Sequence, residues 1–174
     1  MTPRNLVEAQ VLGGFAAVVL AGETVDSQVV SSTIKPDNDP ATNWKSIGCI
    51  KSVAFEPKKK EYTRECPNES GGYSESTIAV VVEDMIVLET DDMSDITHAL
   101  QFGMTGLPTP GTTQAVFEKA ERKLLGWLKI QGRKLDGSAL LDLDVWCEIT
   151  LKTAYKFSNG LTANALGFKV LKSA

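Results

Sequence analysis

The strictest constraint in this sequence is a stretch of thirteen residues, Leu140 to Lys152, in which apolar and polar side chains alternate. One parity is wholly apolar and comprises Leu141, Leu143, Val145, Cys147, Ile149 and Leu151. The other is mostly polar and comprises Leu140, Asp142, Asp144, Trp146, Glu148, Thr150 and Lys152. Because successive side chains of a strand point to opposite faces, the pattern predicts one strand with a single core-facing side. At about 3.3 Å per residue it would span roughly 43 Å, about twice the usual length.

The neighbouring segments also alternate. Residues 124–131 and 166–170 each place apolar side chains on one parity, and turn signals occur at Asp136-Gly137 and Ser158-Asn159-Gly160. The C-terminal third is therefore predicted to be a three-stranded antiparallel meander.

Further strands and one helix are predicted upstream. Residues 47–55 alternate, and residues 77–88 form a β-branched run. The polar stretch 56–73 between them is predicted to be a long loop or a projecting hairpin. Residues 95–102 have helical spacing, with Asp92 as a capping residue. The fold class that follows is mainly β, with two packed antiparallel sheets or a distorted β-barrel and one flanking α-helix.

Residues 1–43 are expected to form an N-terminal arm or linker that could lie between subunits, ahead of one domain over residues 44–174. The apolar run 11–21 is too short for a membrane span of about 18 residues, so no membrane contact is expected. Gly13-Gly14 interrupts the run, and Arg4 is its one preceding base, so a cleaved signal is not expected either.

Composition narrows the classes of function. The net charge is −4 and the basic residues are scattered, whereas a dedicated nucleic-acid binder usually carries a basic patch. Three cysteines without C-x-x-C spacing predict buried reduced thiols, as in a cytoplasm, rather than a disulfide framework or a zinc site.

The chemistry of catalysis is missing from the sequence. His98 is the one histidine, and no nucleophile signature accompanies it. The acidic residues between Glu83 and Asp92 lack the order of a calcium loop, and the Gly-rich run 103–111 lacks the lysine of a phosphate loop. We therefore expect no enzymatic activity, no cofactor and no metal.

Two polar features admit simple explanations. Lys58, Lys59 and Lys60 lie among glutamates, which indicates a solvated loop tip rather than a DNA contact. Trp146 lies on the polar parity of the long strand, where it meets either a partner protein or a loop of its own chain.

The order of these elements resembles a known family. The matching segments are Trp44-x-x-Ile47-Gly48-x-Ile50, Phe55-Glu56-Pro57, the strand that ends at Val87-Leu88 and leads into the helix at Asp95, Gly126 to Gln131, and Leu141 to Trp146. Over roughly residues 44–171 the chain is similar to the major tail tube protein of long-tailed, siphophage-type bacteriophages and related phage-derived particles.

The resemblance implies a structural virion protein rather than an enzyme. In that family six subunits form a ring whose inner strands join into one β-barrel, and rings stack into a tail tube that passes DNA without binding it specifically. It implies as partners further copies of the chain and the tail tip or baseplate, tape measure and tail terminator proteins. It also implies a place in the virion tail after assembly in the host cytoplasm.

The same resemblance suggests roles for particular residues. Residues 56–73 would be the ring-stacking loop, with Lys58, Lys59, Lys60, Tyr62 and Arg64 as its contact residues. The polar parity of the long strand would line the lumen through Asp142, Asp144, Glu148 and Lys152, and Trp146 would lie at an interface. Acidic groups in a lumen would repel DNA phosphates.

Two other readings remain open. A small-ligand-binding β-barrel or sandwich would be a monomer with an apolar pocket. The inner tube of a contractile tail or tailocin would share the strand pattern. The lone histidine argues against a hydrolase on a β scaffold.

Overall fold

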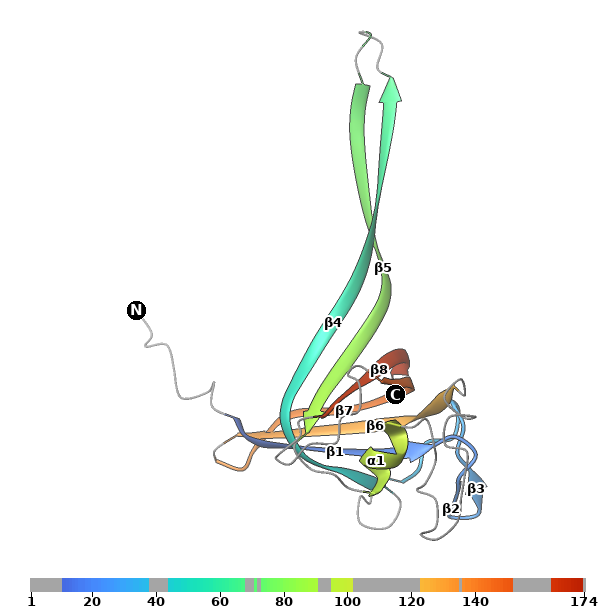
Figure 1. Ribbon diagram of the computed structural model, residues 1–174, viewed down its shortest axis with the longest axis vertical. Coiled ribbons are helices and arrows are strands. Elements are labelled where there is room, and N and C mark those ends of the chain that lie inside the picture. The colour runs from blue at the N-terminus through green and yellow to red at the C-terminus, as the bar shows by residue number, and fades with distance from the viewer. Residues whose placement is uncertain are drawn as a thin grey trace.

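The computed structural model describes residues 11–37, 44–67, 71, 73–90, 95–101, 123–134, 136–151 and 164–173. Within these ranges, antiparallel strands close into a barrel in the order β1-β4-β5-β8-β7-β6 (Figure 1). The strands are β1 Val11–Leu20, β4 Lys45–Pro67, β5 Tyr73–Thr90, β6 Leu124–Lys134, β7 Ala139–Leu151 and β8 Asn164–Ser173. A small separate sheet pairs β2, Thr24–Val25, with β3, Gln28–Val29, and α1 is Asp95–Gln101. The predicted mainly-β fold with one helix is confirmed. Of the two predicted arrangements, two packed sheets or a distorted barrel, the structure has the barrel.

The C-terminal meander is confirmed in its topology. β6 pairs antiparallel with β7, and β7 with β8. Gly137 adopts a φ of 81° in the β6–β7 turn, a conformation that favours glycine. Asp136 accepts hydrogen bonds from the Ser138 hydroxyl at 2.6 Å and amide at 2.8 Å, which lower the pKa of its carboxyl. The predicted turn at 158–160 and the capping residue Asp92 lie outside the described residues.

The core fills the barrel. Val145, Cys147 and Ile149 of β7 are buried in the main hydrophobic cluster, and Leu141 and Leu143 pack against it. The apolar parity predicted for this strand is therefore the core face. The helix α1 contributes Ile96 and Leu100 to the same cluster. It is tied to β4 by the Thr97 hydroxyl, which donates to the Ile47 carbonyl at 2.8 Å.

The segment over residues 11–20 differs from the expected arm, because it forms the barrel strand β1 between β4 and β6. Ala16 and Val18 face the main cluster, whereas Ala17 and Val19 join a second cluster on the outer side of the barrel. A strand buried on both faces is apolar at both parities, and so it gives no alternating signal. The barrel thus begins at β1, well before residue 44.

The stretch 56–73 is a projecting hairpin, one of the two forms that the sequence allowed. β4 and β5 pair in register from Ile50 opposite Thr90 to Pro67 opposite Tyr73. The rest of the barrel meets only their inner ends, since β1 pairs with β4 over Lys45–Cys49 and β8 pairs with β5 over Met85–Thr90. The outer part rises well away from the barrel as the teal and green ribbons of Figure 1.

Membrane crossing by a helix finds no support in the described part of the chain. None of its helices has both the length and the apolar character that a membrane span needs.

Candidate assembly surface

The outer face of β6 and β7 carries the second hydrophobic cluster. Trp127 and Trp146 meet there edge to face, with ring centroids 5.6 Å apart, beside the buried side chains of Trp44 and Val30. The indole nitrogen of Trp127 donates to the Ser31 carbonyl at 2.9 Å, which ties residues from the β2–β3 region across the pair. Trp146 is 6% exposed within the chain itself. Packing by a segment of its own chain therefore accounts for its burial, and a role between subunits stays a prediction.

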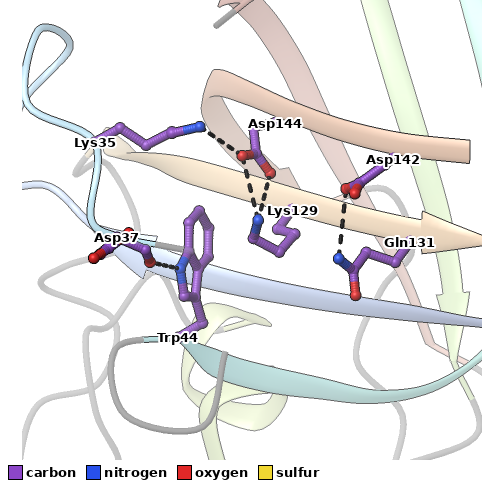
Figure 2. A network of polar contacts seen from close by, with 7 residues as sticks. All are labelled: Lys35, Asp37, Trp44, Lys129, Gln131, Asp142 and Asp144. Carbon is purple, nitrogen blue, oxygen red and sulfur yellow. Dashed lines mark hydrogen bonds and ion pairs between the residues drawn. The ribbon is translucent and has the colours of Figure 1, made fainter. Parts of the chain in front are cut away.

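A buried ion pair lies next to this cluster (Figure 2). Lys129 is 3% exposed, and its Nζ lies 3.1 Å from Oδ1 and 3.3 Å from Oδ2 of Asp144. Lys35 donates to the same carboxylate at 2.8 Å. The Lys129 ammonium also lies 4.9 Å from the centre of the Trp44 ring. Asp144 thus holds residues before Asp37 against the outside of the barrel.

The lumen candidates share the outer face of β7, but their surroundings differ. Asp142 is exposed and accepts a hydrogen bond from the Gln131 amide at 3.5 Å. Asp144 is engaged in the buried pair, and Glu148 lies 3.7 Å from Nζ of the exposed Lys123. Lys152 lies outside the described residues. β7 is hydrogen-bonded to β6 on one side and, over Val145–Leu151, to β8 on the other. Another copy could pair with that half of β7 only by displacing a strand, whereas the edge of residues 139–144 away from β6 meets no described strand.

The hairpin, by contrast, has two open edges. The outer edge of β4 meets no described strand between residues 57 and 65. The outer edge of β5 meets no described strand between residues 77 and 84. Unpaired edges are templates for pairing with another chain. A two-stranded hairpin is also marginally stable by itself in water. The projecting segment is therefore the part of the described structure best suited to recruit a further strand.

Charge is separated between the two faces of this hairpin. On β4, Lys60, Tyr62 and Arg64 share one parity, and Glu61 and Glu65 share the other. Residues paired across the strands lie on the same face, so Ile78 and Val80 join the first parity opposite Tyr62 and Lys60. We call the surface formed by Lys60, Tyr62, Arg64, Ile78 and Val80 the basic face. The surface formed by Glu61, Thr63, Glu65 and Thr77 is the acidic face.

Ion pairs secure the base of the hairpin. Glu83 lies 3.3 Å from the Lys58 ammonium on β4 and 3.5 Å from the Lys169 ammonium on β8. Partial desolvation acts to raise the pKa of Glu83, but the hydrogen bonds and charges of these two lysines together hold it below its ordinary value. Of the residues predicted to make ring-stacking contacts, Lys59 lies on the acidic face of β4. The other four lie on the opposite face, which is the side of the basic face: Lys58, Lys60, Tyr62 and Arg64.

One end of the barrel is open. A cavity of roughly 570 Å³ lies where β1 and β7 begin and β6 ends. We call it the barrel mouth, and it is lined by Gly14, Ile50, Lys51, Ser52, Val53, Ile130, Gln131, Gly132, Leu140 and Leu141. A bulge between Ile50 and Ser52 inserts Lys51, so that both Ile50 and Val53 pack against the core. No sequence pattern indicates this cavity, because its walls come from strands far apart in the chain.

Groups suited to chemistry are few in the described residues. None of them forms a set of three or more His, Cys, Asp or Glu side chains placed to hold a metal. Cys147 is buried, which raises the pKa of its thiol, and its Sγ lies 3.5 Å from the Gly126 carbonyl. Cys66 is half-buried and lies near the hairpin tip. His98 falls in α1, but its side chain lies outside the described part.

Comparison with known proteins adds a weak structural likeness. The chain matches no protein-family profile and no curated protein sequence. Among solved structures it is similar to a chain described as belonging to the cryo-EM structure of the anti-feeding prophage (AFP) baseplate, six-fold symmetrised. The TM-score is 0.40 at 11% identity, over 93% of this chain and 91% of that one. A TM-score of this size assigns no function.

Proposed function

We propose that this chain is a structural protein of a phage or phage-derived particle, whose copies form hexameric rings that stack into a tail tube for DNA delivery. The observation that carries the proposal is the projecting β4–β5 hairpin with its two open edges. In a ring, the β4 edge of one copy pairs with the β5 edge of the next. Such head-to-tail contacts close into a ring when the rotation between copies allows it.

The hairpins are better placed than β7 to form the shared wall of a channel. β7 has strand partners on both sides over Val145–Leu151 and one open edge over residues 139–144, whereas each strand of the outer hairpin has an open edge along its whole length among the described strands. Glu61 and Glu65 on the acidic face then replace Asp142, Asp144 and Glu148 as the groups that repel DNA in the lumen. In this proposal the partners are further copies of the chain and the tail tip or baseplate, tape measure and terminator proteins. The inner tube of a contractile tail would use the same contacts.

The experiment is a direct test of self-assembly. The purified full chain is followed by analytical ultracentrifugation over a wide concentration range, and the same samples are imaged by negative-stain electron microscopy. We expect rings roughly 80–100 Å across, or tubes built from them, as six domains of this size around a channel require. A chain that stays monomeric at every concentration, including in the presence of a crowding agent and of co-expressed tail-tip protein, contradicts the proposal.

A second candidate function rests on the barrel mouth. Its cavity and apolar walls fit a small-ligand-binding barrel, since ligand sites are common at the mouths of β-barrels. This function predicts a monomer that binds an environment-sensitive apolar dye with a stoichiometry near one. Displacement of such a dye by assembly of the wild-type chain favours the structural function instead, because another protein copy then covers the cavity.

A further inference from the structure

The basic face of the hairpin and the barrel mouth are complementary surfaces on the same chain. Resting on the structural function proposed above, we infer that the basic face of one copy docks over the barrel mouth of a second copy. The contact is separate from strand pairing at the hairpin edges, because it uses the side chains of one hairpin face.

The basic face has an apolar centre that nothing in the described structure covers. Tyr62 is 53% exposed, Ile78 60% and Val80 47%. All three lie on the part of the hairpin that projects from its own barrel, so the barrel core cannot bury them (Figure 1). Contiguous exposed apolar side chains of this kind mark interaction sites on soluble proteins. Lys60 and Arg64 flank this centre, and the Lys60 ammonium lies 5.1 Å from the Tyr62 ring centre.

The barrel mouth offers the matching features. Its walls include Ile50, Val53 and Leu141, and Leu140 at its rim is 45% exposed. The rim is acidic on one side, because Gln131, which lines the mouth, donates its hydrogen bond to the exposed carboxylate of Asp142 (Figure 2). An aromatic ring with two aliphatic neighbours can thus cover an apolar cavity while a basic side chain reaches Asp142.

A second copy fits these surfaces better than other partners. A nucleic acid would engage Lys60 and Arg64, but it leaves Ile78 and Val80 exposed and meets Glu61 and Glu65 on the reverse face of the same narrow hairpin. The barrel mouth supplies an apolar surface with the carboxylate of Asp142 beside one side of its rim and Lys51 among its lining residues. It is present in the same number of copies as the hairpin. Because two different surfaces meet, the contact is head-to-tail and can repeat from copy to copy.

Site-specific cross-linking tests the contact. A photoreactive benzoylphenylalanine replaces Tyr62 in the full chain, which is mixed with isotopically heavy wild-type chain, assembled and irradiated. We expect light-to-heavy cross-linked peptides that contain residues 50–53, 130–132 or 139–142. The matched control carries the same group at Thr63, the neighbouring residue on the acidic face, and should not label these peptides. Labelling of other surfaces from position 62, or equal labelling from both positions, overturns the inference.

A charge exchange gives an independent test. Arg64→Asp and Asp142→Arg each leave like charges facing each other in the docked arrangement, so we expect either change to raise the critical concentration for assembly by about tenfold. The double variant restores the opposite charges and should recover most of the loss. Both side chains are exposed, so thermal unfolding of the unassembled variants should match that of wild type. No recovery in the double variant overturns the inference.

These outcomes separate the inference from the function on which it rests. Wild-type chain that assembles, without cross-links from position 62 to the mouth, contradicts the docking alone. Wild-type chain that never associates contradicts the structural function itself. Assembly with edge-to-edge cross-links only would keep the ring and reject the second contact.

Discussion

At the scale of single residues, Gly126 of β6 lies very close to the backbone of β1. A Cβ atom there would lie 2.5 Å from the Val19 carbonyl oxygen and 3.3 Å from the Leu20 Cα, both backbone atoms of β1. Because backbone in a closed barrel cannot yield locally, we expect Gly126→Ala to lower the free energy of unfolding by about 1–3 kcal/mol. Urea unfolding followed by tryptophan fluorescence measures this change.

Gly132 in the same strand provides the control. A Cβ atom there would meet Leu141 at 3.6 Å, an ordinary contact, so Gly132→Ala should change the unfolding free energy by less than about 1 kcal/mol in either direction. Equal effects of the two substitutions would mean that the close approach of β1 and β6 is not what requires glycine at position 126.

The Asp144–Lys129 pair sets a second residue-scale expectation. Asp144→Asn leaves the ammonium of the buried Lys129 without its counter-charge, so the unfolding free energy should fall by about 3 kcal/mol. Replacing both partners, as Lys129→Met with Asp144→Leu, should recover most of this loss. The comparison is Glu148→Gln, which removes the pair with the exposed Lys123 and should cost less than about 1 kcal/mol. Comparable losses for Asp144→Asn and Glu148→Gln would show that burial does not govern the first pair.

At the scale of elements, a strand could be predicted from the sequence where one of its faces is apolar and the other is polar. β7 was predicted almost to its ends, because its core face is apolar and its outer face mostly polar. β1 was not, since Ala17 and Val19 on its outer face are as buried as Val18 on its inner face. The stretch 56–73 stayed ambiguous because both faces of the hairpin are polar, and its alternation is in the sign of the charge rather than in hydrophobicity.

The hairpin itself should be dispensable for folding. Replacement of residues 60–80 by Asn-Gly leaves Lys59 opposite Val81, the spacing that a two-residue turn closes. Neither hydrophobic cluster of the described residues includes a side chain from the deleted segment. We therefore expect the melting temperature to shift by less than about 4 °C, while assembly is lost. Loss of the folded barrel in this variant would show that the hairpin is part of the folding unit.

At the scale of the whole molecule, closure of the barrel decides where assembly can occur. Once β1 pairs with both β4 and β6, the longest open strand edges of the described barrel lie on the hairpin, and shorter ones remain elsewhere, such as residues 139–144 of β7. The basic residues there could be found from sequence, because Lys58, Lys59, Lys60 and Arg64 lie close together in the chain. The barrel mouth could not, since its walls meet only when β1, β4, β6 and β7 come together. The lumen assignment to β7 stays a prediction, and the meander predicted from the sequence already gave that strand its two partners, β6 and β8.

Hydrogen exchange can follow this change from open to covered edges across the molecule. In the unassembled chain, backbone amides in residues 57–65 and 77–84 should exchange quickly, because the isolated hairpin opens readily, whereas those of β1, β6 and β7 should be protected. Assembly should slow exchange in the hairpin ranges by more than about tenfold and leave the barrel strands nearly unchanged, since one new hydrogen-bonded neighbour is gained only at the edges. Mass spectrometry of peptic peptides resolves the ranges, and the hairpin-shortened variant supplies the baseline for the barrel. Protection that rises uniformly over all strands would point to overall stabilisation, and against hairpin edges as the place where copies join.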